Sequence, residues 1–262
     1  EQHAESYRKI RNTFRYLLGN LNDTFNNNEL ELVDIDSLPE LEQFMLHKIF
    51  KLNLNFKKYF KNYDFHNLYK ELLNFCTVDL SSFYFDIRKD TLYCDTKDSA
   101  KRKSTLLLLN IILDSLIRWF APILSFTTEE IYQLVSKNKK SIHLEKFLSY
   151  PKKFENSKLY EKWNKLIKIR DLCNLSIEEK RASKEIGSSL ESSLEIELDK
   201  ESFKIFKKVD FAELCIASSV KIIEGSGKEI KVLTTKALGK KCPLCWKIVQ
   251  EGCQRPNCEI KK

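Results

Sequence analysis

The stretch Lys240-Lys241-Cys242-Pro243-Leu244-Cys245-Trp246-Lys247, with Cys253 and Cys258 soon after it, is the part of the sequence around which we interpret the rest. Two cysteine pairs with short spacings are typical of a closed tetrahedral zinc site. Such a site folds a segment too short to bury a core, because metal binding contributes roughly 10 kcal/mol or more. We therefore predict one structural, non-catalytic Zn²⁺ per chain, held by Cys242, Cys245, Cys253 and Cys258.

The spacing of the two pairs leaves other interpretations open. The first pair has two intervening residues, and the second has four, which is the upper end of common ligand spacings. A redox-active Cys-x-x-Cys would require a strand before it and a helix after it, and plain free thiols are also compatible. The second pair, within reach of the first, favours the metal site over both.

The tail that carries these cysteines is basic. Residues 236–262 hold seven Lys and Arg against two Glu, so the tail stays positive even with four thiolates around a zinc ion. The whole chain of 262 residues has a net charge of +8. This charge favours a polyanionic partner such as nucleic acid, although a composition rich in Lys and Asn would produce it without one.

Length, cysteine use and hydrophobicity indicate a globular intracellular protein. The 42% of apolar residues suffice for a core, and the other four cysteines are spread through apolar or amphipathic stretches, as free thiols of a reducing cytoplasm are. The apolar stretch 106–126 contains Asn110, Asp114 and Arg118, so we expect a core helix and no membrane span. The chain begins with Glu1 and has no leader-like start, so we expect a piece of a longer polypeptide.

Apolar periodicity predicts an all-helical bundle over residues 1–150. We expect helices over 6–21, from a capping box at 37–40 through 52, over 64–75, 98–120 and 127–135, and a short helix or turn over 79–88. The first helix carries Arg8, Arg11 and Arg15 as a basic stripe. Such a stripe is either a solvated face or a row of guanidinium groups that meet successive phosphates.

Residues 151–235 have a different pattern. A long charged helix is expected over 159–184, stopped by Gly187, and is followed by alternation over 194–198, a helical stretch over 203–209, and strand-rich stretches over 215–223 and 229–233. The expected fold is therefore mainly α. It comprises a helical bundle, a long helix with a small α/β junction element, and a C-terminal zinc knuckle over 236–262.

Several segments, in order, resemble the C-terminal region of bacterial isoleucyl-tRNA synthetases, a family of class I aminoacyl-tRNA synthetases. The segment Tyr7-Arg-Lys-Ile-Arg-Asn-Thr-Phe-Arg-Tyr-Leu-Leu-Gly-Asn-Leu21 resembles the start of the anticodon-binding helical domain. Further similar segments, covering the later helices, the junction and the zinc finger, are 84–95, 119–131, 142–145, 184–191 and 242–246. Several long matches in the right order are far more specific than any one motif.

The resemblance implies a role in protein biosynthesis. The intact enzyme attaches isoleucine to tRNA-Ile with ATP and Mg²⁺ and hydrolyses mischarged valine, in a catalytic core and an editing domain of the same polypeptide. None of the four His residues begins a His-Ile-Gly-His-like signature, and six glycines form no Gly-rich phosphate loop. We therefore assign no catalytic residue here, and expect a cytoplasmic monomer whose share of the work is to hold the anticodon stem-loop.

Basic and aromatic residues are the candidates for contact with that RNA, because splayed bases stack on aromatic rings and phosphates meet Lys and Arg. The candidates are Arg8, Arg11, Arg15, Lys240, Lys241, Trp246, Lys247 and Arg255. Trp246 is equally well explained as a hydrophobic lid on the zinc site. The four residues within the second cysteine pair, where the family usually has two, imply either a wider loop that still closes the site or a degenerate finger; we favour the wider loop.

Two other functions compete with this one. A stand-alone zinc-containing tRNA-binding protein would use the same residues in trans. A different nucleic-acid-binding module, such as a DNA glycosylase of the formamidopyrimidine type, ends in a similar knuckle but requires an N-terminal Pro nucleophile and a different core. The helical segments have no place in the glycosylase.

Overall fold

The computed structural model describes residues 2–21, 30–136, 140–227, 229–253, 255 and 258. They form two compact units. Unit 1 comprises residues 1–92 and 97–160, and unit 2 comprises residues 93–96 and 161–262.

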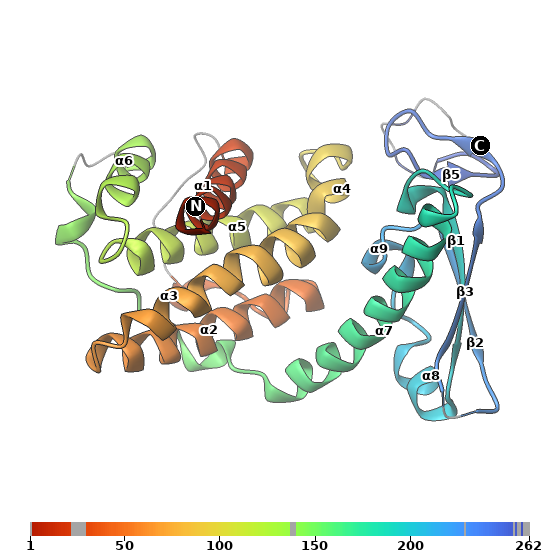
Figure 1. Cartoon of the computed structure of the whole chain (residues 1–262), viewed down its shortest axis with the longest axis horizontal. Coiled ribbons are helices and arrows are strands. Elements are labelled where there is room, and N and C mark those ends of the chain that lie inside the picture. The colour runs from red at the N-terminus through yellow and green to blue at the C-terminus, as the bar shows by residue number, and fades with distance from the viewer. Residues whose placement is uncertain are drawn as a thin grey trace. The chain divides into compact units, whose positions relative to one another are not determined.

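Unit 1 is a helical bundle built around one apolar helix. The long helices are α1 (Gln2–Leu21), α2 (Glu40–Lys61), α3 (Phe65–Asn74), α4 (Asp86–Cys94), α5 (Ala100–Phe120) and α6 (Ser125–Val135). Short turns of 3₁₀-helix are η2 (Leu30–Leu32), η4 (Ile142–Leu144) and η5 (Lys152–Phe154). Helix α5 contacts α1, α2 and α6 (Figure 1). Every residue from Leu108 to Phe120 is buried.

The expected periodicity of α1 is confirmed. Ile10, Phe14, Leu17 and Leu21 lie on the buried face of the helix. Because these positions recur every three to four residues, they form one apolar stripe that packs on the bundle and leaves the other side of the helix in water.

The start of α2 differs from the expected capping box. The helix begins at Glu40 after Pro39, which offers no side-chain cap, and the Ser37 hydroxyl donates to the Asp34 carbonyl at 2.8 Å instead of capping. Proline fixes its own φ and has no N–H, so the helix starts without a side-chain cap. At α5, Ser99 and not Asp98 accepts the N–H of Arg102 at 3.4 Å.

Between α3 and α4 the chain forms a π-helix, η3 (Phe75–Phe85), so the expected short helix or turn over 79–88 is part of a continuous helical run. The run places two side chains, Tyr84 and Arg88, against Glu42 of α2. The Arg88 guanidinium donates to both Glu42 carboxylate oxygens at 2.6 Å, and the Tyr84 hydroxyl donates to Oε1 at 2.9 Å. Burial raises the pKa of Tyr84, so its hydroxyl remains a donor.

The polar residues within the apolar stretch of α5, Asn110, Asp114 and Arg118, are buried in protein. Arg118 donates to Asp114 at 2.9 Å and to the Lys146 carbonyl at 2.6 Å, so the two buried charges of this helix are paired with each other. Among the described residues, no helix is both long and apolar enough to cross a membrane.

Unit 2 contains a three-stranded sheet. Helix α7 (Ser157–Ala182) enters this unit at Glu161; the other elements are η6 (Ser189–Glu191), β1 (Ser192–Leu198), α8 (Lys200–Phe206), α9 (Phe211–Leu214), β2 (Ser219–Glu224) and β3 (Lys231–Lys236). The strand order is β2-β1-β3, in which β1 is parallel to β2 and antiparallel to β3 (Figure 1). The parallel pair is connected through α8 and α9, as a parallel pair requires a crossover.

One face of the central strand of this sheet is buried. Alternate residues of β1, namely Ser192, Leu194, Ile196 and Leu198, are buried, which confirms the expected alternation. The Ser176 hydroxyl of α7 contacts the Thr234 hydroxyl of β3 at 2.7 Å, so α7 lies against the sheet.

Helix α7 ends earlier than expected. It stops at Ala182, and Lys184 has a φ of 60°, so the left-handed residue that ends the helix is Lys184 and not Gly187. The Glu185 carboxylate accepts from Lys180 Nζ at 2.9 Å, which holds the reversed chain against the last turn.

The mainly helical fold with a small sheet and a terminal cysteine cluster agrees with the fold class predicted from the sequence. The three-part division into 1–150, 151–235 and 236–262 stays a prediction, because compactness does not show which segments fold independently.

Candidate functional site

The cysteine-rich tail of unit 2 is organised by a short hairpin. Strand β4 (Lys240–Lys241) pairs antiparallel with β5 (Ile248–Val249). Between them, the Cys242 N–H donates to the Lys247 carbonyl and the Trp246 N–H donates to the Cys242 carbonyl, both at 2.9 Å. Trp246 adopts a φ of 63°, so the turn tightens enough to bring Cys242 and Cys245 together.

Gly239 is required where the hairpin begins. Its φ is 136°, and a Cβ placed on it would lie 2.4 Å from the Val249 carbonyl oxygen. Only glycine fits there without moving the backbone of β5.

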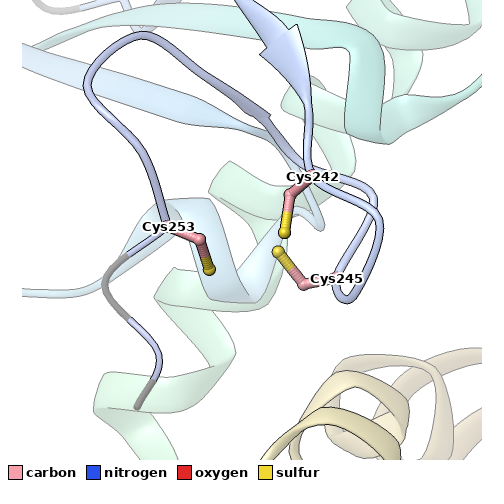
Figure 2. Close-up of side chains that lie close together, drawn as sticks. All are labelled: Cys242, Cys245 and Cys253. Carbon is pink, nitrogen blue, oxygen red and sulfur yellow. The ribbon is translucent and has the colours of Figure 1, made fainter. Parts of the chain in front are cut away.

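Three thiols converge beyond this hairpin. The sulfur atoms of Cys242, Cys245 and Cys253 all lie within 4.8 Å of one another, and Figure 2 shows them pointing into a common space from two loops. Cys258 is also buried, with its Sγ 3.4 Å from that of Cys242. The four predicted zinc ligands are therefore neighbours, although the group in which every pair is within 4.8 Å comprises the first three.

This donor set fits a metal ion that prefers thiolates. Sulfur atoms that share a tetrahedral Zn²⁺ at about 2.3 Å lie about 3.8 Å apart, a separation similar to those found here. All eight cysteines are free thiols, so no disulfide competes for these sulfurs. The chain after Cys245 forms the hairpin and not the helix that a redox-active Cys-x-x-Cys requires, so the metal interpretation is the better one.

The local backbone favours ionisation of one thiol. Burial opposes ionisation of Cys242, but hydrogen bonds from the Cys245 N–H and from the Cys258 thiol lower its pKa to about 7. Burial raises the pKa of Cys245 to about 12. Coordination of a metal ion requires deprotonated sulfur, so the lowered pKa of Cys242 favours its use as a ligand.

Basic residues and one aromatic ring surround the cluster on the solvent side. Lys240 and Lys241 are exposed, and Lys247 is half-buried. The ring of Trp246 is 61% exposed, and Lys241 Nζ lies 5.7 Å from its centroid. An exposed ring next to ammonium groups can stack on a base while the cations meet phosphate.

Arg255 has a different environment from the other predicted RNA contacts. Its Nε lies 3.3 Å from Asp95 Oδ1, and both side chains are mostly buried. The carboxylate of Asp95 neutralises part of the charge that Arg255 would offer to an RNA phosphate, and the role of Arg255 in RNA binding stays a prediction.

Two residues near the cluster escaped the sequence analysis. Cys94 is buried among the four tail cysteines, and its thiol donates to the Leu244 carbonyl at 3.3 Å; Asp95 pairs with Arg255. The sequence places both about 150 residues from the tail, and we treated Cys94 as one more buried free thiol. The sequence offers only the adjacent pair Cys94-Asp95 as an indication of these contacts, and a cysteine followed by an acidic residue is too common to be specific.

The arginine stripe lies on the exposed side of α1 in unit 1. Arg8, Arg11 and Arg15 are all exposed. Arg11 donates to the Tyr7 hydroxyl at 3.2 Å, and that hydroxyl contacts Thr127 Oγ1 at 2.9 Å, so Arg11 is held against α6. Within the described part of the chain, Arg8 and Arg15 have no carboxylate at ion-pair distance, which leaves two guanidinium groups available to an anion.

Comparison with known proteins gives a consistent result. Residues 42–198 match the family described as the anticodon-binding domain of tRNA ligase. The chain is 66% identical over 255 residues to the isoleucine–tRNA ligase of Pelagibacter ubique, covering 97% of this chain and 28% of that protein. It is 42% identical to that of Methylacidiphilum infernorum (93% and 26% covered) and 36% identical to that of Bartonella quintana (96% and 27%). The chain thus spans about a quarter of the length of these relatives.

Proposed function

Because the chain belongs to the family of anticodon-binding domains of tRNA ligases, we propose that it binds the anticodon stem-loop of tRNA-Ile as part of an isoleucine–tRNA ligase. The family match confirms the resemblance that the sequence motifs indicated. The observation that carries the proposal is the similarity of nearly the whole chain to isoleucine–tRNA ligases, at 66% identity over 255 residues in one of them.

The described surfaces support a role in RNA binding. Unit 1 exposes the guanidinium groups of α1, and unit 2 exposes Trp246 beside Lys240 and Lys241. Arginine and lysine contacts to phosphates supply a large share of the affinity for nucleic acid, and aromatic stacking holds splayed bases of a single-stranded loop. Each unit therefore carries groups suited to a different part of a stem-loop.

In this proposal the chain positions the RNA and does no covalent chemistry. We assign the chemistry to the remainder of a longer, monomeric and cytoplasmic polypeptide. That part activates isoleucine with ATP and Mg²⁺, joins it to the tRNA and hydrolyses mischarged valine. Binding energy at the anticodon serves that reaction by selecting the correct tRNA and fixing its orientation.

We propose further that Cys242, Cys245, Cys253 and Cys258 hold one structural Zn²⁺. When bound, the ion joins the two loops that carry the cysteine pairs. The knuckle presents Trp246, Lys241 and Lys247 to solvent. Backbone hydrogen bonds in the turn around the first pair fix the backbone of Trp246. Zinc here has no part in the chemistry of aminoacylation.

RNA binding is tested by titrating the chain with tRNA-Ile and with an unrelated tRNA at several salt concentrations. We expect tighter binding of tRNA-Ile and a steep salt dependence. The double variant Arg8→Ala/Arg15→Ala should lower the slope of log K against log salt by up to roughly two, because each phosphate contact adds roughly one. The matched control is Lys57→Ala/Lys58→Ala, on α2 of the same unit. Equal affinity for both tRNAs would reduce the function to general binding of polyanions.

The metal site is tested by measuring zinc in the purified chain. We expect one zinc per chain in the wild type, and none in Cys253→Ser/Cys258→Ser. The control is Cys173→Ser, which changes a buried thiol of α7. One zinc per chain in the Cys253/Cys258 double variant would refute the assignment of those two ligands.

A further inference from the structure

A short segment of the bundle's sequence belongs to the other unit. Residues 93–96, at the end of α4, group with unit 2, although Leu92 before them and Lys97 after them belong to unit 1. The segment is therefore joined covalently to unit 1 at both ends, while two of its residues, Cys94 and Asp95, contact the cysteine-rich tail.

The first contact is made by Cys94. Its side chain is buried with the four tail cysteines, and Leu244 and Val249 pack against the group. The Cys94 thiol donates to the Leu244 carbonyl at 3.3 Å, and Leu244 lies between the two cysteines of the first pair. Cys94 thus holds the loop that carries Cys242 and Cys245.

The second contact is made by Asp95. Its carboxylate lies 3.3 Å from Arg255 Nε, with the two side chains 21% and 22% exposed. Arg255 lies between the cysteines of the second pair, and its carbonyl accepts the Cys258 N–H at 3.2 Å. Asp95 thus holds the loop that carries Cys253 and Cys258.

We propose that Cys94 and Asp95 form a clamp on the knuckle whose engagement is coupled to metal binding. The inference rests on the proposed metal centre. The clamp holds one residue from each of the two loops, and a metal ion joins those same loops. An ion that fixes the loops therefore brings Leu244 and Arg255 into place for the clamp. By linkage, the clamp raises the metal affinity by the same factor.

Cys94 and Asp95 are positioning residues in this scheme, since they act on the loops and not on the ion. Four thiolates already complete a tetrahedral zinc site, so a fifth sulfur is not needed as a ligand. The coupling means that metal binding at the knuckle affects the end of α4. The two segments lie about 150 residues apart in the sequence but are in contact in the structure.

The first test measures zinc affinity by competition with a chromophoric chelator. Cys94→Ala/Asp95→Asn should bind zinc roughly tenfold more weakly, the product of one hydrogen bond and one ion pair worth about threefold each. Cys94→Ser, which keeps a donor for the Leu244 carbonyl, should bind more tightly than Cys94→Ala. The control Asp98→Asn removes an exposed charge three residues away and should change the affinity less than twofold. A Cys94/Asp95 double variant within twofold of the wild type would overturn the clamp.

The second test measures how fast each cysteine of the wild type reacts with a maleimide, with zinc bound and after chelation. We expect Cys94 to react at least tenfold faster once zinc is removed, while Cys76, buried in unit 1, keeps the same rate. A wild-type chain that binds no zinc overturns the metal centre and the clamp together. If the chain binds zinc but Cys94 reacts with the maleimide at the same rate with zinc bound and after chelation, the clamp alone is overturned.

Discussion

The buried ion pair between Glu42 and Arg88 allows a quantitative prediction about the helical unit. The two side chains are 0% and 3% exposed, and the guanidinium meets the carboxylate through two hydrogen bonds of 2.6 Å. Arg88→Met leaves the carboxylate buried without its cation, and Glu42→Met leaves the guanidinium buried without its anion. Either variant should lose about 3–5 kcal/mol of stability, because an uncompensated charge stays in the core.

The double variant Glu42→Met/Arg88→Met should be more stable than either single variant. Apolar side chains of similar volume replace both charges, so no charge is left to desolvate. A residual loss of about 1–2 kcal/mol is expected, because the Tyr84 hydroxyl, which donates to Glu42 at 2.9 Å, loses its acceptor. The coupling between the two sites is therefore several kcal/mol.

Urea unfolding followed through Trp119 measures this effect in unit 1. Trp119 is buried in the bundle, and Trp163→Phe/Trp246→Phe as the common background removes the other two tryptophans. With a denaturant slope of about 2 kcal/mol/M, a loss of 4 kcal/mol lowers the midpoint by about 2 M. A double variant less stable than both single variants would refute the reasoning, and so would a single variant whose midpoint is unchanged.

Three further predictions concern the knuckle and a buried histidine. Trp246→Ala should weaken tRNA-Ile binding by about 1–3 kcal/mol, the value of one stacked base, with zinc content unchanged; unchanged affinity would favour the lid interpretation. Gly239→Ala should destabilise the hairpin and slow zinc uptake, because its Cβ would meet the Val249 carbonyl oxygen at 2.4 Å; uptake at the wild-type rate would contradict this. Burial lowers the pKa of His47, whose Nδ1 accepts the Asn156 N–H at 2.8 Å. As the pH falls, the imidazole is therefore protonated in the unfolded chain at a higher pH than in the folded chain. The stability that neutral His47 contributes is present above a pH of about 6.5 and is lost as the pH falls below it. His47→Gln keeps a hydrogen-bond acceptor but does not titrate, so its urea midpoint should change less between pH 7 and pH 5 than that of the wild type. Equal changes of the urea midpoint with pH in the two proteins would contradict the assignment.

Features that depend on near neighbours in sequence were the predictable ones. The apolar stripe of α1, the alternation of β1 and the helix over α5 follow from residues three to four or two positions apart, and all three were confirmed. Helix ends were less predictable. The capping box before α2 did not form, and α7 ended at Ala182, after which Lys184 has the left-handed conformation that Gly187 was expected to supply.

The amino-acid sequence by itself determined the helical bundle, the small sheet, the cysteine spacing and the family resemblance, because each of these is a local or ordered pattern along the chain. Only the tertiary structure decided which distant residues meet. Arg88 pairs with Glu42 across 46 positions, and Cys94 reaches Leu244 across 150. The physical reason is that such contacts depend on how helices and loops pack in space. Residue spacing along the chain specifies the period of a helix or strand. It does not specify which distant segment the apolar face packs against or which residue pairs with a buried charge.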